Sequence, residues 1–378
     1  MRKLNHFSLD GLLSAIGHSQ IVRPAIALAS RGFKVQLVSL EQSDDTRELA
    51  VQLSRAGIGW FYDHFEPGGS PKVYARNVAR LTKLALRADK PDVAWIRGFP
   101  AAPVGLMWAL RGVPFVYDIR GFWVDQRAES DHWPQAAVTA ARALEATYYR
   151  SAVAAVSLTQ LGADDITRGR FGKWSKDKRA VVIPTCVDYE AFTLRTEAKG
   201  LRIGFVGSVN SDYLIDESLA LFTHVQALHP DATLVCVSAQ HAQLRTLALK
   251  AGIKNIEAFS ARHKDMPKIM RTLDWGLLLL KESEVKRASM PTKLAEFLAA
   301  GVRPVHYGCN SELGDWVAKT GSGFTLSSLT ELPTAAERIV NTPFDAQALT
   351  RARTIAEAHF SLRSGVERYA SLFHSLSR

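Results

Sequence analysis

Short apolar strands alternate with helical segments along almost the whole chain, and this alternation constrains the fold more than any other feature. Residues of β-branched and aromatic type predict strands at 34–40, 57–62, 93–97, 115–118, 153–157, 181–183, 201–206, 233–238, 275–280 and 303–307. Helical patterns lie between many of them, at residues 21–30, 73–88, 133–150, 219–228 and 335–340. Such alternation predicts parallel sheets that helices cover on both faces.

The length of the chain indicates more than one domain. At 378 residues it is too long for one ordinary core and suits two domains of roughly 180 to 200 residues each. The strand pattern restarts at Leu201, after the polar segment 195–200. A last helical segment, interrupted by Ser361 and Ser364, is expected to pack back on the first domain. The predicted parts are residues 1–198, 199–355 and 356–378.

Composition and charge narrow the class of protein. Apolar residues make up 47% and charged residues 22%, which is typical of a soluble globular protein. The net charge of +10 favours acidic partners such as phosphorylated small molecules or anionic lipid. A nucleic acid is not expected as a partner, because the charge is diffuse and no recognised binding module is present.

The cysteine residues and the N-terminal residues indicate the cellular compartment of the protein. Cys186, Cys236 and Cys309 lie far apart and in no metal-ligand spacing, which suits free thiols in a reducing compartment. The first residues lack the apolar core of a signal peptide, and no run approaches the roughly 18 apolar residues of a membrane span. We therefore expect a cytoplasmic protein, with any membrane contact peripheral and at the inner face of the plasma membrane.

The segment 289–305 has the pattern of a binding site for phosphate and ribose. Ser289 is a good N-cap and Pro291 suits a first turn, so a helix should begin near Thr292. The unpaired N–H groups of a helix start favour phosphate, and three nearby residues add positive charge. These residues are Lys286, Arg287 and Lys293.

Glu296 follows in the same helix. A carboxylate beside a phosphate site makes sense if it accepts hydrogen bonds from the hydroxyls of a ribose, as in dinucleotide-binding folds. The alternative is an exposed first-turn acid that the helix dipole favours. Lys286 and Lys293 have the corresponding alternative of solvated surface lysines.

Together these segments resemble a known family, the retaining, nucleotide-sugar-dependent glycosyltransferases of the GT-B fold, family 4. The resemblance covers nearly the whole chain and rests on five motifs in order. These are the glycine loop at 9–20, Asp-Ile-Arg-Gly-Phe-Trp at 118–123, Ile-Pro-Thr-Cys-Val-Asp at 183–188, Gly-Phe-Val-Gly-Ser at 204–208 and the segment 289–305.

The resemblance implies an architecture and a chemistry. The fold would be GT-B, an α/β fold of two doubly wound Rossmann-like domains facing a central cleft. The reaction would move a sugar from a nucleoside-diphosphate sugar to a glycan or lipid-linked acceptor, as in surface polysaccharide, lipopolysaccharide or exopolysaccharide biosynthesis. The anomeric configuration would be retained by front-face attack, in which the leaving phosphate helps to deprotonate the acceptor. No cofactor is expected, and no metal, because neither an Asp-x-Asp pair nor a His cluster with ligand spacing occurs.

The family motifs also carry over roles for individual residues. The residues that would bind the donor are Gly11, Gly207, Ser208, Arg287, Ser289, Thr292, Lys293 and Glu296. Those with a catalytic role would be Arg120, Asp118 and Lys286. For Arg120 the alternative is a surface arginine paired with Asp125, and for Asp118 it is a residue that merely ends its strand.

Two departures from the family pattern leave other functions open. Ala288 stands where many members have a first glutamate, and Ser208 stands where many have an arginine that holds the diphosphate. Both substitutions would suit a non-catalytic relative that binds nucleotide sugars. A GT-B isomerase or hydrolase is a further alternative, although no carboxylate pair for proton abstraction is evident.

Two other features have open interpretations. The basic stretch 168–179, with Phe171 and Trp174, could lie on an anionic membrane or on nucleic acid, or be a solvated loop. The aromatic residues Trp123, Trp133 and Tyr148-Tyr149 could line an acceptor groove or belong to the core.

Overall fold

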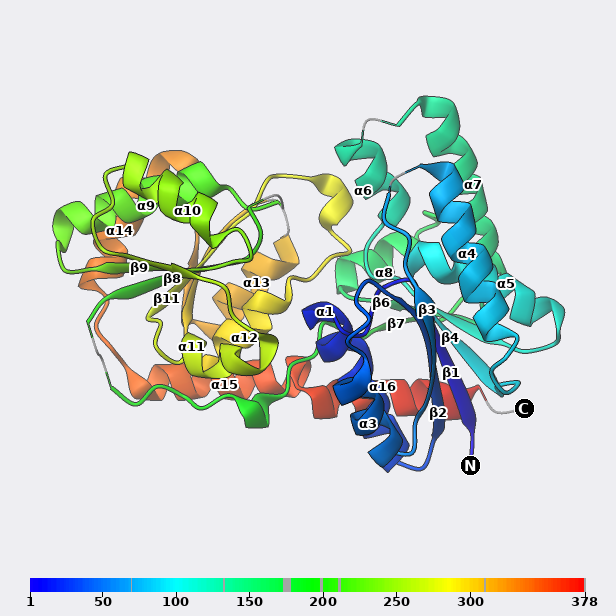
Figure 1. Cartoon of the computed structure of the whole chain (residues 1–378). Coiled ribbons are helices and arrows are strands. Elements are labelled where there is room, and N and C mark those ends of the chain that lie inside the picture. Colours follow the sequence, from blue (N-terminus) through cyan, green and yellow to red (C-terminus); the bar gives the residue numbers. More distant parts are fainter. Residues whose placement is uncertain are drawn as a thin grey trace. The chain divides into compact units, whose positions relative to one another are not determined.

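The computed structural model describes residues 1–68, 70–131, 133–172, 178–197, 200–209, 212–308 and 311–376, and it divides into two compact units. The first unit comprises Met1–Cys186, Val285–Ser289 and Leu362–Arg378; the second comprises Val187–Glu284 and Met290–Ser361 (Figure 1). The predicted boundary at residue 198 lies outside the described residues. The chain passes from the first unit to the second between Cys186 and Val187.

The described part of the first unit contains a seven-stranded parallel sheet in the order β3-β2-β1-β4-β5-β6-β7. Its strands are β1 (Lys3–Ser8), β2 (Lys34–Glu41), β3 (Gly59–His64), β4 (Val93–Arg97), β5 (Phe115–Asp118), β6 (Ala154–Ser157) and β7 (Ala180–Val182). The chain moves outward from β1 in both directions. This order is that of a doubly wound sheet.

Helices cover both faces of this sheet, as the alternation of apolar strands and helical segments in the sequence predicts. They are α1 (Ala15–Gly17), α2 (Arg23–Ser30), α3 (Arg47–Arg55), α4 (Pro71–Ala85), α5 (Gly98–Leu110), α6 (Trp123–Ser130), α7 (Gln135–Ser151), α8 (Gln160–Thr167) and α16 (Leu362–Ser375). One core layer lies between the sheet and α4, α5 and α7. The other contains residues of α2, α3 and α16.

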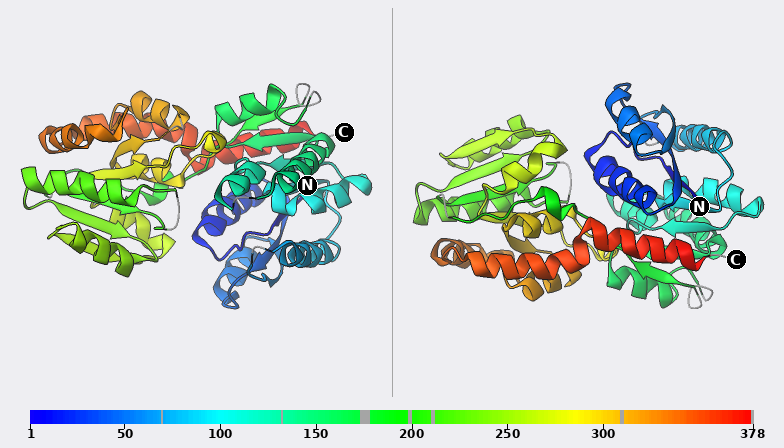
Figure 2. Two further views of the ribbon diagram at one scale, coloured as in Figure 1. Left: turned by 90° about the horizontal axis from the view of Figure 1, so that it is seen from above. Right: turned by 90° about the horizontal axis from the view of Figure 1, so that it is seen from below.

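The last helix belongs to the first unit. α16 packs beside α2, and Val366, Tyr369, Leu372 and Phe373 are part of its core. Both views of Figure 2 show this helix, in red, running along the first unit. The predicted interruption at Ser361 is present, because α15 ends at Phe360 and Ser361 is extended; the helix continues through Ser364, where we predicted a second interruption.

The second unit is also built on a parallel sheet. Its described strands have the order β10-β9-β8-β11-β12-β13. They are β8 (Arg202–Val206), β9 (Thr233–Val237), β10 (Ile256–Phe259), β11 (Trp275–Leu279), β12 (Arg303–Tyr307) and β13 (Phe324–Thr325). The helices are α9 (Ile215–Leu228), α10 (His241–Lys250), α11 (Met266–Met270), α12 (Thr292–Ala300), α13 (Ser311–Thr320), α14 (Leu332–Asn341) and α15 (Ala346–Phe360). The predicted parallel α/β architecture is confirmed in both units, while β1, β10 and β13 were not predicted.

Candidate functional site

The helix at the predicted phosphate and ribose site begins at Thr292, as predicted, and ends at Gly301. Gly301 has φ 73°, the left-handed conformation that glycine adopts at helix ends. The N-cap prediction was wrong: Pro291 occupies that position, and Ser289 belongs to the first unit. There the Ser289 hydroxyl accepts a hydrogen bond from Gln126 Nε2 at 2.9 Å, which holds it away from a capping role.

Glu296 is buried within α12, with 1% of its surface exposed. The alternative of an exposed first-turn acid was therefore wrong. Its carboxylate lies 2.6 Å from Lys293 Nζ, the hydrogen-bond partner of Glu296 among the described residues. Because an ionised carboxylate accepts up to about four hydrogen bonds, Glu296 retains acceptor capacity for the hydroxyls of a ligand.

Gly207 and Ser208 follow β8 at the carboxyl end of the second sheet. A Cβ on Gly207 would lie 2.6 Å from the ring of Tyr213, so only glycine permits this close contact. Burial raises the pKa of Tyr213, and the negative charges of Glu296 and Asp212 add to the effect. The structure thus brings Gly207, Tyr213 and Glu296 into one region of the second unit.

Ser208 lies beside them in a separate hydrogen-bonded group. Its hydroxyl donates to Gln240 Oε1 at 3.2 Å, and that oxygen also accepts from the Ser238 hydroxyl at 3.1 Å. Sequence reasoning gave no role to Tyr213 or Gln240. Gln240 follows the end of β9, the neighbour of β8, and a search for polar residues at the ends of predicted strands would have found it.

In the first unit, Gly11 belongs to a loop that the carboxylate of Glu41 holds. The backbone N–H groups of Leu12 and Leu13 donate to Glu41 at 2.8 and 3.2 Å. A Cβ on Gly11 would lie 2.8 Å from Glu41 Oε2, so glycine is needed for the loop to approach this buried carboxylate. Glu41 ends β2, and sequence reasoning did not single it out.

Asp118, which is fully buried at the end of β5, pairs with the partly exposed Arg120. Arg120 Nη1 lies 3.3 Å from Asp118 Oδ1, and Arg120 Nη2 lies 3.4 Å from the side-chain oxygen of Gln20. The expected alternative partner of Arg120 was wrong, because Asp125 instead pairs with Arg142 and Arg170. Asp118 does end its strand, but it also accepts hydrogen bonds from Trp95 and Tyr369.

Lys286 and Arg287 lie in a segment, Val285–Ser289, that packs on the first unit, whereas Thr292 and Lys293 belong to the second. The carbonyl of Arg287 accepts a hydrogen bond from the Thr159 hydroxyl at 2.7 Å. Ala288, which follows Arg287, is fully buried against Gly162, where a Cβ would lie 2.7 Å from that of Ala288. Ala288 is thus a core residue, and its small size suits the packing of this segment.

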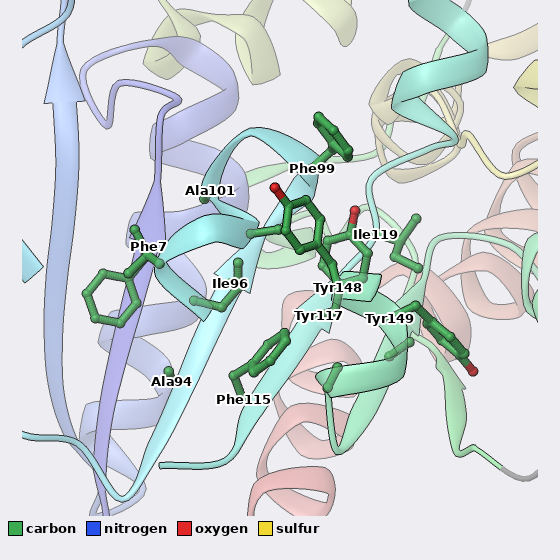
Figure 3. Close-up of a cluster of buried hydrophobic side chains, with 14 of the residues drawn as sticks. Phe7, Ala94, Ile96, Phe99, Ala101, Phe115, Tyr117, Ile119, Tyr148 and Tyr149 are labelled. Carbon is green, nitrogen blue, oxygen red and sulfur yellow. The ribbon is translucent and has the colours of Figure 1, made fainter. Parts of the chain in front are cut away.

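The aromatic residues with open interpretations belong to the core of the first unit. Tyr148 and Tyr149 are buried (Figure 3). Trp123 and Trp133 are partly buried and pack against the same cluster. The Trp123 ring stacks on Phe99 with centroids 4.9 Å apart. In the basic stretch 168–179, residues 173–177 with Trp174 lie outside the described residues, and so does Cys309.

A pocket of about 260 Å³ lies in the first unit between α6, α7 and the residues after α8. Its walls are Asp125, Arg142, Glu145, Arg170 and Phe171. Burial, and to a lesser extent the charge of Asp125, raises the pKa of Glu145 to about 8. Among the described residues, the Tyr117 hydroxyl donates a hydrogen bond to the Glu145 carboxyl group at 3.4 Å.

The described residues contain no group of three or more His, Cys, Asp or Glu side chains arranged to hold a metal ion. None of their helices is long and apolar enough to cross a membrane.

Comparisons with known proteins agree with this architecture. Residues 20–186 match the family model of the glycosyl transferase 4-like domain. No curated protein matches the sequence. Among solved structures, the chain is similar to sucrose-phosphate synthase from Thermosynechococcus elongatus, with a TM-score of 0.74, 14% identity and coverage of 100% of this chain and 99% of the other.

Two other solved structures are similar over their whole length. HepE from Anabaena, in complex with UDP and glucose, has a TM-score of 0.71, 16% identity and full coverage of both chains. WaaG, a glycosyltransferase involved in lipopolysaccharide biosynthesis, has a TM-score of 0.66 and 15% identity over 98% of each chain. With its matched domain and its two parallel sheets, the chain is a glycosyltransferase of the GT-B fold that carries a glycosyl transferase 4-like domain at residues 20–186.

Proposed function

We propose that the protein transfers a sugar from a nucleoside-diphosphate sugar to a glycan or lipid-linked acceptor, with retention of the anomeric configuration. The observation that carries the proposal is the buried carboxylate of Glu296, paired with Lys293 and close to Tyr213 and Gly207. A buried carboxylate with spare acceptor capacity suits the two hydroxyls of a ribose. The adjacent Lys293 suits a phosphate.

The similar structures support a uridine nucleotide as the first donor to test. HepE is described in complexes with UDP and with UDP-glucose, and MnaA of S. aureus in a complex with UDP. WaaG is described as involved in lipopolysaccharide biosynthesis. For this chain we propose surface polysaccharide assembly at the inner face of the plasma membrane as the setting.

The proposed reaction breaks the bond between the anomeric carbon and the diphosphate oxygen and forms one from that carbon to an acceptor hydroxyl oxygen. The acceptor proton moves to the leaving diphosphate, so neither a metal nor a protein nucleophile takes part. The developing charge on the diphosphate needs fixed donors, usually the largest catalytic contribution. For this task we propose Lys293, the backbone at Gly207-Ser208, and the cations Arg120, Lys286 and Arg287.

The donor class can be measured by thermal unfolding of the protein with UDP, GDP, dTDP, ADP and CMP. We expect a base-selective stabilisation, of about 2.7 kcal/mol for ligand at about 100 times its dissociation constant. NMR of a turnover reaction with the matching nucleotide sugar should then show a product with the anomeric configuration of the donor. Absence of stabilisation by every nucleotide would contradict the proposed donor site, and an inverted product would contradict retention.

Gly207→Ala is expected to weaken nucleotide binding about 10-fold, because the added Cβ would displace the Tyr213 ring beside Glu296. Titration calorimetry with UDP measures the change. Gly314→Ala is the matched control, since its Cβ would meet Thr325 Oγ1 only at 3.4 Å, an ordinary contact. Equal affinity of the Gly207→Ala variant and the unmodified protein would show that this turn does not contribute to the site.

A further inference from the structure

A buried polar network in the first unit surrounds the guanidinium of Arg120. Asp118 is fully buried and accepts three hydrogen bonds: from Trp95 Nε1 at 3.1 Å, the Tyr369 hydroxyl at 3.0 Å and Arg120 Nη1 at 3.3 Å. A buried carboxylate is costly unless it is paired and hydrogen-bonded. Here three donors from β4, α16 and the end of β5 meet that requirement.

Aromatic packing fixes the position of Tyr369. Its ring lies 4.7 Å from that of Trp95 and stacks on Phe373 at 5.9 Å, measured between ring centroids. Burial, and next the charge of Asp118, raises the pKa of Tyr369 well above its usual value. The protonated phenol donates its hydrogen bond to Asp118.

Gln20 holds the guanidinium from a second side. Its Oε1 accepts from Arg120 Nη2 at 3.4 Å and from the backbone N–H of Cys186 at 3.1 Å. Its Nε2 donates to the carbonyl of Cys186 at 2.9 Å. Both polar groups of the Cys186 backbone thus set the orientation of the Gln20 amide, so that its oxygen faces Arg120.

The contacts leave part of Arg120 available. A guanidinium has five N–H donors, and the described residues engage two of them, one through Asp118 and one through Gln20. About 15% of the side chain is exposed. The guanidinium is therefore fixed by two hydrogen bonds and still has N–H groups that can bind a ligand. A cation fixed in position in this way can stabilise the negative charge that develops in a transition state.

We propose that Tyr369 and Gln20 are positioning residues for Arg120: Tyr369 orients Asp118, and Asp118 and Gln20 together fix the guanidinium for the charge that develops during sugar transfer. This inference rests on the proposed function. It assigns a role in turnover to the last helix, α16, whose Tyr369 lies 251 residues away from Asp118 in the sequence.

The test is Tyr369→Phe, which removes one hydroxyl and keeps the ring in its aromatic contacts. We expect kcat with UDP-glucose, or with the nucleotide sugar that the thermal screen selects, to fall about 10-fold, within the range found when an orienting partner is removed. KM for the nucleotide sugar should stay within about 2-fold, because the ground-state contacts are unchanged. Tyr148→Phe is the matched control, since Tyr148 is also a buried tyrosine of the first unit and is not among the described residues that donate a hydrogen bond to Asp118.

A double-mutant cycle separates positioning from mere stabilisation. If Tyr369 acts through Arg120, Tyr369→Phe should lower kcat in the unmodified protein and leave it unchanged in the Arg120→Ala background. A structural role would lower the active fraction by the same factor in both backgrounds. That outcome would overturn the inference. Unmodified turnover by the Arg120→Ala variant would also overturn it, but would leave the proposed sugar transfer intact.

A second measurement does not depend on activity. The Arg120 Nε–H signal, assigned by its loss in Arg120→Ala, should shift in the NMR spectrum of Tyr369→Phe and stay in place in Tyr148→Phe. An unchanged signal in Tyr369→Phe would overturn the inference even if the unmodified protein turned over no nucleotide sugar. Failure of turnover alone would count against the proposed function instead.

Discussion

Replacing Glu296 by glutamine is expected to weaken UDP binding by about 100-fold, the largest loss of affinity that we predict for a single substitution. A hydrogen bond to a charged group contributes about 1.5 to 3 kcal/mol, and the carboxylate is proposed to accept from the ribose. Glutamine has nearly the same shape, but it lacks the charge that holds Lys293 at 2.6 Å. Titration calorimetry with UDP measures the change directly.

Glu257→Gln is the matched control for this prediction. Glu257 also lies in the second unit and pairs with Arg202 at 2.7 Å, but it is half-exposed on β10. Its replacement should leave UDP affinity unchanged. If Glu296→Gln binds UDP as tightly as the unmodified protein, the carboxylate serves only to pair with Lys293 and the ribose assignment is wrong.

Glu145→Gln is expected to stabilise the protein increasingly as the pH rises from about 4.5 to about 8. Burial raises the pKa of Glu145 to about 8 in the folded protein, whereas in the unfolded chain the carboxyl ionises near 4.5. Below pH 4.5 both states are protonated and the group has no effect. Between the two pKa values only the unfolded state is ionised, so folding loses up to about 5 kcal/mol by pH 8.

The measurement is the difference in unfolding free energy between the variant and the unmodified protein at pH 5, 6.5 and 8. Taking the difference cancels the other titrating groups. Glutamine keeps the size of the side chain and a group for the hydrogen bond with Tyr117. A difference that stays constant from pH 5 to pH 8 would show that Glu145 ionises normally in the folded protein.

Much of the fold could be predicted from local sequence, because strands that are buried on both faces appear in the sequence as short runs of apolar residues. β4 and β5 begin and end at the predicted residues. β1, an interior strand of the first sheet between β2 and β4, was missed because its sequence Lys-Leu-Asn-His-Phe-Ser contains Asn5 and His6. Tertiary contacts accommodate both, since the Asn5 amide donates to the carbonyl of Asp89 and the His6 ring packs on Trp95.

Less of the candidate site could be predicted. The family motif pointed to Glu296, but its burial depends on the packing of α12 within the second unit. Ser289 had every local mark of an N-cap, yet its partner is Gln126, far away in the sequence. The partners of the Asp118–Arg120 pair were missed for the same reason: Tyr369 and Gln20 carry no local pattern that indicates a role, and only the folded chain brings Tyr369 to Asp118 and Gln20 to Arg120.

The placement of α16 in the first unit also has a consequence for biosynthesis. Leu372 and Phe373 complete a core layer with strands that are translated before the second unit, whereas α16 is translated after it. At ~5–20 residues per second, the first sheet waits on the order of ten seconds or more for its final cover. During that interval the apolar face of the first sheet is accessible to chaperones. A chain truncated within the second unit would have a first unit without α16, so one of its core layers would be incomplete.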